Sequence, residues 1–242
     1  GVGFPVLKGE IFSLIGPNGA GKTTMFNLIS RVLPVTSGTI TLDGNDIPRT
    51  APHRIAPLGM GRTFQNLAVF KHASVVDNLL VGRHSHMKTS VLGGLLFGPT
   101  TRAAKRAHRK RVEEIIDFLE IEAIRKTPVG RLPYGLQKRV ELGRALATEP
   151  KLLLLDEMVS GMNAEETEDI ARFILDLKEE LEITVMMIEH DMGIVTDISD
   201  HIAVMNFGER IAYGTPDEIR ADPHVIEAYL GHKLQEDTEA VH

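Results

Sequence analysis

The residues best suited to chemistry form one run near the start of the chain, Gly16-Pro17-Asn18-Gly19-Ala20-Gly21-Lys22-Thr23. This run matches the phosphate-binding pattern G-x-x-x-x-G-K-[ST] without a gap. Its glycines let backbone N–H groups approach a phosphate closely, where side chains would obstruct. In this pattern Lys22 reaches the β- and γ-phosphates of a nucleotide, and the hydroxyl of Thr23 ligates Mg²⁺. We therefore predict a nucleotide site formed by this run and by Thr24 after it.

The segments on either side of this run suit the same chemistry. The apolar residues Ile11–Ile15 predict a buried strand that leads into the run, and residues 24–29 predict a helix that leads out of it. The positive end of such a helix faces a bound anion. A plain glycine turn between a strand and a helix is the alternative, and this context favours the nucleotide site.

A second group of candidate residues follows another apolar run. Residues 152–155 are four leucines, and Asp156 and Glu157 come directly after them. A buried strand would deliver Asp156 to the carboxyl end of a parallel sheet, where the phosphate loop also lies. There Asp156 can hold Mg²⁺, often through water, and Glu157 can position or activate an attacking water. A core strand that ends in a solvated acidic turn is the alternative.

The elements that must position these residues alternate along the chain. Apolar runs predict core strands, and helical patterns separate them, such as residues 164–180 with Asn163 as the cap. This alternation is typical of an α/β fold with a parallel sheet. Helical periodicity dominates residues 65–148, which predicts a helical subdomain inserted into the core. The predicted core strands are residues 11–15, 152–155, 184–188 and 202–206, and the predicted outer strands are 39–42 and 210–213.

Composition excludes several classes of protein. The formal net charge of −6 argues against a general nucleic-acid binder, which would be basic. The absence of cysteine excludes disulfides and thiolate metal sites. No apolar run approaches the roughly twenty residues that a membrane-spanning helix needs. The chain begins with Gly1 and shows no signal peptide, so we expect its natural N-terminus to lie outside this sequence.

In their order along essentially the whole chain, these motifs resemble the nucleotide-binding subunit of an ATP-binding cassette (ABC) transporter. The resemblance implies a P-loop NTPase with a RecA-like parallel sheet, an inserted helical subdomain and outer antiparallel strands. It divides one ABC ATPase domain, residues 1–231, into a core of 1–64 and 149–231 and a helical subdomain of 65–148, with a polar tail at 232–242. The implied cofactors are ATP and Mg²⁺.

The resemblance also assigns roles to residues outside the two motifs above. Gln65, in Arg62-Thr63-Phe64-Gln65-Asn66, fits the Q-loop glutamine that contacts Mg²⁺ and the attacking water. His190 ends the strand at 184–188 as the H-loop histidine does, and would bind the γ-phosphate and hold Glu157 in line. Residues 160–163 correspond to the D-loop, and Met158 replaces the proline common after the catalytic glutamate.

The signature motif is where the chain departs most from the family. Leu132-Pro133-Tyr134-Gly135-Leu136-Gln137 stands in the place of L-S-G-G-Q, which binds the γ-phosphate of ATP held by a second ABC subunit. Pro133 lacks the serine hydroxyl, whereas Gly135 and a helix predicted at 136–148 are kept. The resemblance therefore implies a homodimer or heterodimer whose contact across the nucleotide is weakened.

Within the family, a single acidic cassette without a membrane span implies separate integral membrane permeases. The stretches at 84–111, 214–220 and 225–231 resemble the ATPases of branched-chain amino-acid importers, and those of the related urea and amide importers. A lipopolysaccharide-export ATPase and a soluble ABC ATPase are the alternatives. The importer assignment implies a peripheral protein at the cytoplasmic face of the membrane, an indirect solute-binding partner and no nucleic acid.

Other features receive simpler interpretations. We expect His72, His84 and His86 to form no metal site, because no ligand set of plausible spacing completes them. The basic residues between Arg102 and Arg111 predict a solvated helix rather than a lipid-binding surface, and residues 91–97 predict loop packing rather than a membrane contact. We assign Phe4 to the core and expect the aromatic residue that stacks on adenine to precede Gly1.

Overall fold

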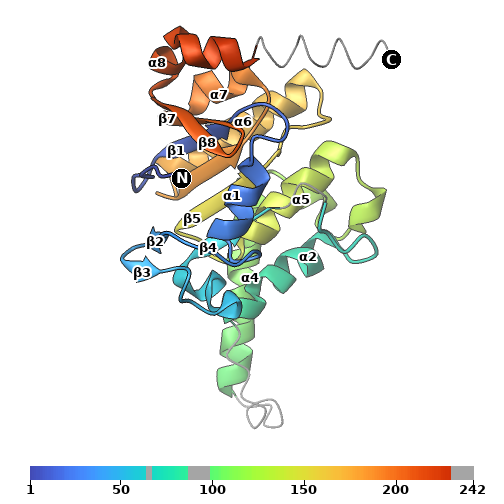
Figure 1. Ribbon diagram of the computed structural model, residues 1–242. Helices are drawn as coiled ribbons and strands as arrows, with labels where there is room; N and C mark the ends of the chain where they lie inside the picture. Colours follow the sequence, from blue (N-terminus) through green and yellow to red (C-terminus); the bar gives the residue numbers. More distant parts are fainter. Residues whose placement is uncertain (64–66, 87–98, 230–242) are drawn as a thin grey trace, which may run out of the picture. The chain divides into compact units, whose positions relative to one another are not determined.

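The computed structural model describes residues 1–63, 67–86 and 99–229 (Figure 1). The chain divides into two compact units. The first unit combines Gly1–Pro52 with Leu154 and the residues after it, and the second unit is His53–Leu153. The predicted insertion at 65–148 lies within the second unit, whereas the predicted tail at 232–242 lies outside the described residues.

The first unit contains the sheet that carries the phosphate loop. Its strands follow the order β5 (Leu152–Asp156, which enters this unit at Leu154), β6 (Thr184–Ile188), β1 (Ile11–Ile15), β7 (His201–Asn206) and β8 (Glu209–Gly214). Strand β1 runs parallel to both β6 and β7, and β8 runs antiparallel to β7. All residues of β1, β5 and β6 are buried, as expected for parallel strands covered on both faces. The α/β fold with a mostly parallel sheet and an outer antiparallel strand is confirmed.

Short polar side chains cap several helices of this unit, whereas the helix that follows Gly21 begins without such a cap. Helix α6 (Ala164–Glu179) starts with a capping box between Asn163 and Glu166, as the sequence predicts, and buries Ile170, Phe173, Ile174 and Leu177. This unit also contains α1 (Lys22–Ile29), α7 (Met192–Ile198) and α8 (Pro216–Ala221), and residues 223–229 are helical as well. A small hairpin joins β2 (Thr41–Leu42) to β3 (Asn45–Asp46). The predicted outer strand at 39–42 is thus shorter, because only its last two residues pair.

The second unit is mainly helical. Helix α2 (Val75–Gly82), which Ser74 caps, packs against α5 (Tyr134–Leu146) and α4 (Pro99–Phe118). Its apolar interior includes Leu79, Ile116 and Val140, all fully buried. The unit also holds strand β4 (Met60–Arg62) and the short 3-10 turns η2 (Ala56–Leu58), η3 (Arg83–His86), η4 (Glu122–Ile124) and η5 (Val129–Arg131); η1 (Pro52–Arg54) lies at its start.

The basic side chains of α4 pair with acids on the helix surface. Lys110 Nζ lies 3.6 Å from Glu114 and Arg111 Nη1 lies 2.8 Å from the same carboxylate. A hydrogen bond from Arg111 holds the pKa of Glu114 below its ordinary value. These pairs fit the solvated helix expected from the sequence, while residues 91–97 lie outside the described residues.

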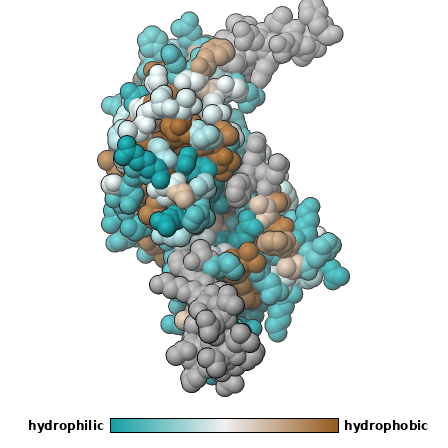
Figure 2. All heavy atoms as spheres, turned by 60° about the horizontal axis from the view of Figure 1, so that its bottom comes forward, coloured by the Kyte–Doolittle hydropathy of each residue, from teal (hydrophilic) through white to brown (hydrophobic). Residues whose placement is uncertain are grey.

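Hydrophilic residues cover much of the face shown in Figure 2, with apolar residues gathered in patches among them. The exposed large apolar side chains include Val32, Phe70 and Phe207. Across residues 1–63, 67–86 and 99–229, the structure contains no helix with the length and apolar character needed to cross a membrane.

Candidate functional site

The phosphate loop, residues 16–23, connects the end of β1 to the start of α1. Gly16 is required by packing, because a Cβ there would lie 2.1 Å from the backbone oxygen of Met205. Gly21 caps α1 with a φ of 96°, in the left-handed region that favours glycine. The loop is also tied to the turn after β7, since the N–H of Gly208 donates to the carbonyl of Ala20 at 3.0 Å. Packing at Gly16, the backbone of Gly21 and this hydrogen bond therefore fix the shape of the loop.

Lys22 lies buried inside this loop. Its Nζ donates to the carbonyl of Gly16 at 2.7 Å and to that of Pro17 at 3.0 Å. Burial lowers the pKa of Lys22, and the charges of Glu157 and Asp156 oppose that change. The ammonium group is thus held among neutral carbonyls close to two carboxylates. A phosphate would offer it a stronger, charged acceptor than either carbonyl.

The two carboxylates lie at the carboxyl end of β5, as the sequence predicts. Asp156, the last residue of β5, is 1% exposed, and Glu157 adopts a left-handed backbone with φ of 51°. The N–H of Glu157 donates to the carbonyl of Ile188 at the end of β6, at 3.0 Å. In this way the neighbouring strand fixes the turn that presents Glu157.

His190 completes this group of residues. Its Nε2 lies 3.0 Å from Oε1 of Glu157, although 33 positions separate the two residues. The side chain of His190 is 46% exposed and that of Glu157 is 16% exposed, so the pair stands at the surface edge of the strands. The structure therefore brings together Lys22, Asp156, Glu157 and His190 in the first unit.

The oxygen donors near the loop suit Mg²⁺. Thr23 is exposed at the first turn of α1, and its hydroxyl and the Asp156 carboxylate are the hard ligands that Mg²⁺ prefers. Within the described ranges, no three His, Cys, Asp or Glu side chains gather as a metal cluster, so the oxygen donors available here are few. Such a set matches an ion that keeps waters and shares a nucleotide's phosphates. Gln65 lies outside the described residues.

A cavity of about 520 Å³ opens beside the phosphate loop in the same unit. Its lining combines Gly19 and Thr24, from the loop and α1, with apolar side chains such as Ile40 and Phe207. Its size lies in the range of small-molecule sites. Phe4 does not contribute to this lining. Its ring stacks on that of the buried Phe12 with centroids 4.9 Å apart, but Phe4 itself is only half-buried, at the border of the core and not within it as the sequence predicted.

The signature region, in the second unit, differs from the expectation in one respect. Helix α5 begins at Tyr134 and not at residue 136, because the N–H of Gln137 already donates to the carbonyl of Pro133 at 3.1 Å. Gly135 is therefore buried within the first helical turn. No side chain caps this helix, and the side-chain amide of Gln137 donates to the carbonyl of Leu132 at 2.8 Å.

Two further residues near the site were missed by sequence reasoning. Glu189, buried at 4% exposure, accepts a hydrogen bond from the N–H of Val159. Burial raises the pKa of Tyr229 to about 12, and a hydrogen bond from the backbone of Gly16 opposes that rise. A carboxylate at the end of a buried strand was the available signal for Glu189. Nothing local marks Tyr229.

Comparison with known proteins gives the family. The ABC transporter family model matches residues 1–160, and the model named branched-chain amino acid ATP-binding cassette transporter matches residues 209–234. The chain is 43% identical, over 231 residues, to the high-affinity branched-chain amino acid transport ATP-binding protein BraF of Pseudomonas aeruginosa. That alignment covers 96% of this chain and 91% of BraF.

Two further similarities agree with this result. LivG of Escherichia coli K12, a protein with the same description, is 40% identical over 222 residues, covering 92% of this chain and 87% of LivG. A nucleotide-free ATP-binding cassette from an ABC transporter superimposes with a TM-score of 0.81 at 33% identity, covering 95% of this chain and 91% of that one. The chain belongs to the ABC transporter family, as one of its ATP-binding cassettes.

Proposed function

We propose that this chain binds MgATP at residues 16–24 and hydrolyses it to power a membrane importer of branched-chain amino acids. The observation that carries the catalytic part is the 3.0 Å contact between His190 and Glu157, beside the buried Lys22. The names of BraF and LivG, and the match at residues 209–234, support the solute.

Nucleotide binding rests on the loop and on the start of α1. Lys22 exchanges its bonds to the carbonyls of Gly16 and Pro17 for bonds to the β- and γ-phosphates. Backbone N–H groups of the loop and the positive end of α1 add to the attraction for the phosphates. The apolar cavity beside Gly19 and Thr24 is the place we assign to the sugar and base.

The hydrolytic step is assigned to Glu157 and His190. Glu157 orients a water and accepts its proton as the oxygen attacks the γ-phosphorus, while the bond from that phosphorus to the ADP oxygen breaks. His190 holds Glu157 and donates a hydrogen bond to the γ-phosphate. Thr23, Asp156 and Gln65 would hold Mg²⁺, which supplies positive charge to the phosphate oxygens when bound. The products are ADP and inorganic phosphate.

Dimerisation is assigned to the signature region. Gly135 and the uncapped N-terminus of α5 would face the γ-phosphate of ATP bound to a second ABC subunit. Since Pro133 supplies neither a hydroxyl nor an N–H, the backbone carries this contact. Two permease subunits would then hold the cassettes face to face at the cytoplasmic side of the membrane, and a solute-binding protein would deliver the amino acid.

Reconstitution with permeases tests the whole proposal. We expect the chain to co-purify with the permeases encoded beside it, and ATP-driven uptake of leucine or isoleucine into vesicles that contain the complex. The matched control is the same complex with Glu157→Gln, which should assemble but not transport. Uptake of urea, or assembly with a lipopolysaccharide-exporting permease, would contradict the assignment to branched-chain amino acids but not the assignment as an ATPase. An ATPase rate that does not change when permeases are added would instead favour a soluble ATPase.

A further inference from the structure

Three consecutive residues, the last one of β6 and the two that follow it, bind the loop after β5. The carbonyl of Ile188 accepts the N–H of Glu157 at 3.0 Å, and Nε2 of His190 contacts the Glu157 carboxylate at 3.0 Å. Between these two, Oε1 of Glu189 accepts the N–H of Val159 at 3.2 Å. The backbone of Ile188 and the side chains of Glu189 and His190 therefore all hold the loop that begins at Glu157.

Glu189 differs from its neighbour in its surroundings. It is only 4% exposed, whereas the side chain of His190 is 46% exposed. A buried carboxylate is costly unless hydrogen bonds compensate its lost hydration. The bond from Val159 is charge-assisted and therefore stronger than a bond between neutral groups. This bond ties the buried Glu189 to the loop that follows β5.

The loop that Glu189 holds needs an anchor. Glu157 has a φ of 51°, a conformation that costs energy in a residue other than glycine and persists only where the surroundings impose it. The next residue is the fully buried Met158, which stands where the family commonly has a proline. A proline there would fix the backbone φ angle, whereas methionine does not. The next residue, Val159, is the one that Glu189 binds.

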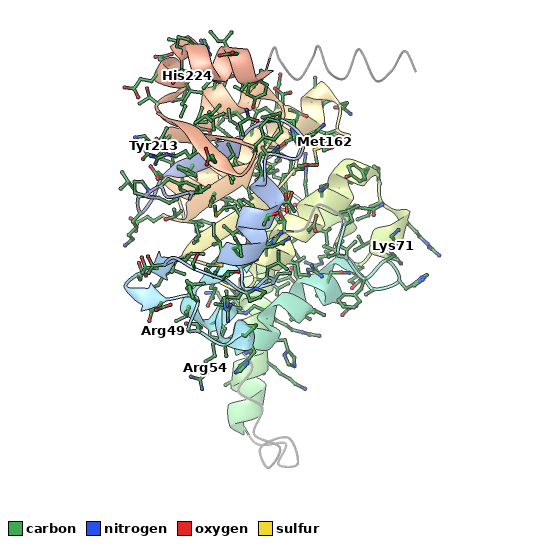
Figure 3. All side chains as sticks on the ribbon, viewed as in Figure 1. Arg49, Arg54, Lys71, Met162, Tyr213 and His224 are labelled. Atoms are coloured by element: carbon green, nitrogen blue, oxygen red, sulfur yellow. The ribbon has the colours of Figure 1, made fainter. Side chains whose placement is uncertain are left out.

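The same loop continues toward α6. The carbonyl of Val159 accepts the N–H of Met162 at 3.1 Å, and Asn163 then caps α6 (Met162 is labelled in Figure 3). Val159 is thus bonded on both sides, to β6 through Glu189 and to the turn before α6. A shift of Val159 would move Glu157 at one end and residues 160–163 at the other.

We propose that Glu189 is a positioning residue, which fixes Val159 by a hydrogen bond and thereby keeps Glu157 in place for hydrolysis. This inference rests on the proposed function, because it requires Glu157 to act on the attacking water. Because the bond from Val159 acts on the loop that carries Glu157, we expect loss of Glu189 to lower kcat and to leave KM for MgATP nearly unchanged.

Three substitutions separate the hydrogen bond from charge and packing. Glu189→Gln keeps an acceptor oxygen at the same length, Glu189→Met keeps the length without the acceptor, and Glu189→Asp keeps the charge on a shorter side chain. Single-turnover ATPase of the purified chain should fall about tenfold or more for the Met and Asp variants, the size expected when a hydrogen bond to a charged group is lost. The Gln variant keeps the acceptor oxygen but loses the charge, so its rate should fall less than that of the Met and Asp variants. Glu179→Met, at an exposed end of α6, is the matched control.

A double-mutant cycle with Glu157→Asp, which keeps a carboxylate base and a measurable rate, tests whether Glu189 acts through Glu157. If it does, Glu189→Met lowers the single-turnover rate much less in the Glu157→Asp background than in the wild-type chain. The inference would be overturned if Glu189→Met, or Glu189→Asp, hydrolysed ATP at the wild-type single-turnover rate. It would also be overturned if the Gln and Met variants lost the same rate, or if the losses in the double-mutant cycle were additive. A Met variant that does not fold leaves the Gln and Asp comparison to decide. A Glu157→Gln chain that hydrolyses ATP normally would instead contradict the proposed function.

Discussion

The phosphate loop and the signature region, to both of which we assign a contact with a nucleotide's phosphates, are built differently. In the first unit, Lys22 is buried in a loop whose shape follows from Gly16 and Gly21, and charged side chains stand next to it. In the second unit, α5 begins after Pro133 with no side-chain cap and no acidic residue in its first turn. Hydrolytic chemistry thus depends on specific side chains, whereas the contact assigned to α5 depends on its backbone.

The comparison predicts its largest effect at Lys22. Lys22→Ala should abolish MgATP hydrolysis, because the buried charge that stabilises the β- and γ-phosphates is lost. Lys8→Ala, at an exposed position in the same unit, is the matched control and should hydrolyse ATP at the wild-type rate. Steady-state phosphate release measures both variants, and appreciable turnover by Lys22→Ala would show that the loop does not depend on this side chain.

The same dependence on side chains is predicted at Glu157. Glu157→Gln should keep ATP binding and stop turnover, since an amide cannot take the proton of the attacking water. Nucleotide binding by fluorescence titration and phosphate release together separate these two properties. Hydrolysis at the wild-type rate would remove Glu157 from the role we assign it.

A stability effect is expected in α5 itself. Nζ of Lys138 lies 3.7 Å from Glu141, and both side chains are fully buried. Lys138→Met should destabilise the chain by about 3 kcal/mol, because the carboxylate of Glu141 would lose a buried counter-charge. The double variant Lys138→Met/Glu141→Leu should recover much of this loss. Denaturant unfolding measures both, and a single variant as stable as wild type would show that α5 is held by its packing alone.

A smaller effect is expected at the start of α5. Pro133→Ser restores a hydroxyl, and one neutral hydrogen bond contributes about 0.5–1.5 kcal/mol, so ATP-dependent dimers of the Glu157→Gln chain should tighten several-fold. Gly135→Asp should abolish these dimers by placing a carboxylate opposite the γ-phosphate. Sedimentation with ATP measures both variants. Dimers that respond to neither change would show that this helix end does not touch the partner's nucleotide.

The smallest effect at neutral pH is expected at Tyr229, which supports the phosphate loop from the C-terminal side. Its pKa is raised to about 12 from an ordinary 10, so the folded chain favours the neutral phenol. The contribution of Tyr229 to the free energy of unfolding is constant below about pH 10 and falls as the pH rises from about 10 toward 12. Tyr229→Phe should remove this particular loss of stability. Denaturant unfolding of both chains between pH 8 and about 11.5 tests it, and parallel pH profiles would contradict it.

Local patterns were enough to predict the phosphate loop, the core strands and the start of α6. A strand such as Ile11–Ile15 is recognisable because its buried run is continuous, and Asn163 caps α6 through a residue only three positions away. The start of α5, which follows a proline, was predicted less accurately from local sequence. The first turn of α5 uses the carbonyl of Pro133, so the helix starts earlier than the glycine in the motif suggested.

By itself the sequence determined which residues can do chemistry, because the spacing of Gly16, Gly21, Lys22 and Thr23 encodes the loop in one short segment. Only the tertiary structure decided how distant residues meet. Strands β5 and β6 are neighbours in the sheet, and this order places His190 against Glu157 and Glu189 against Val159. The physical reason is that such contacts depend on strand order and on the burial of the strands between helices, and neither leaves a periodic mark in the local sequence.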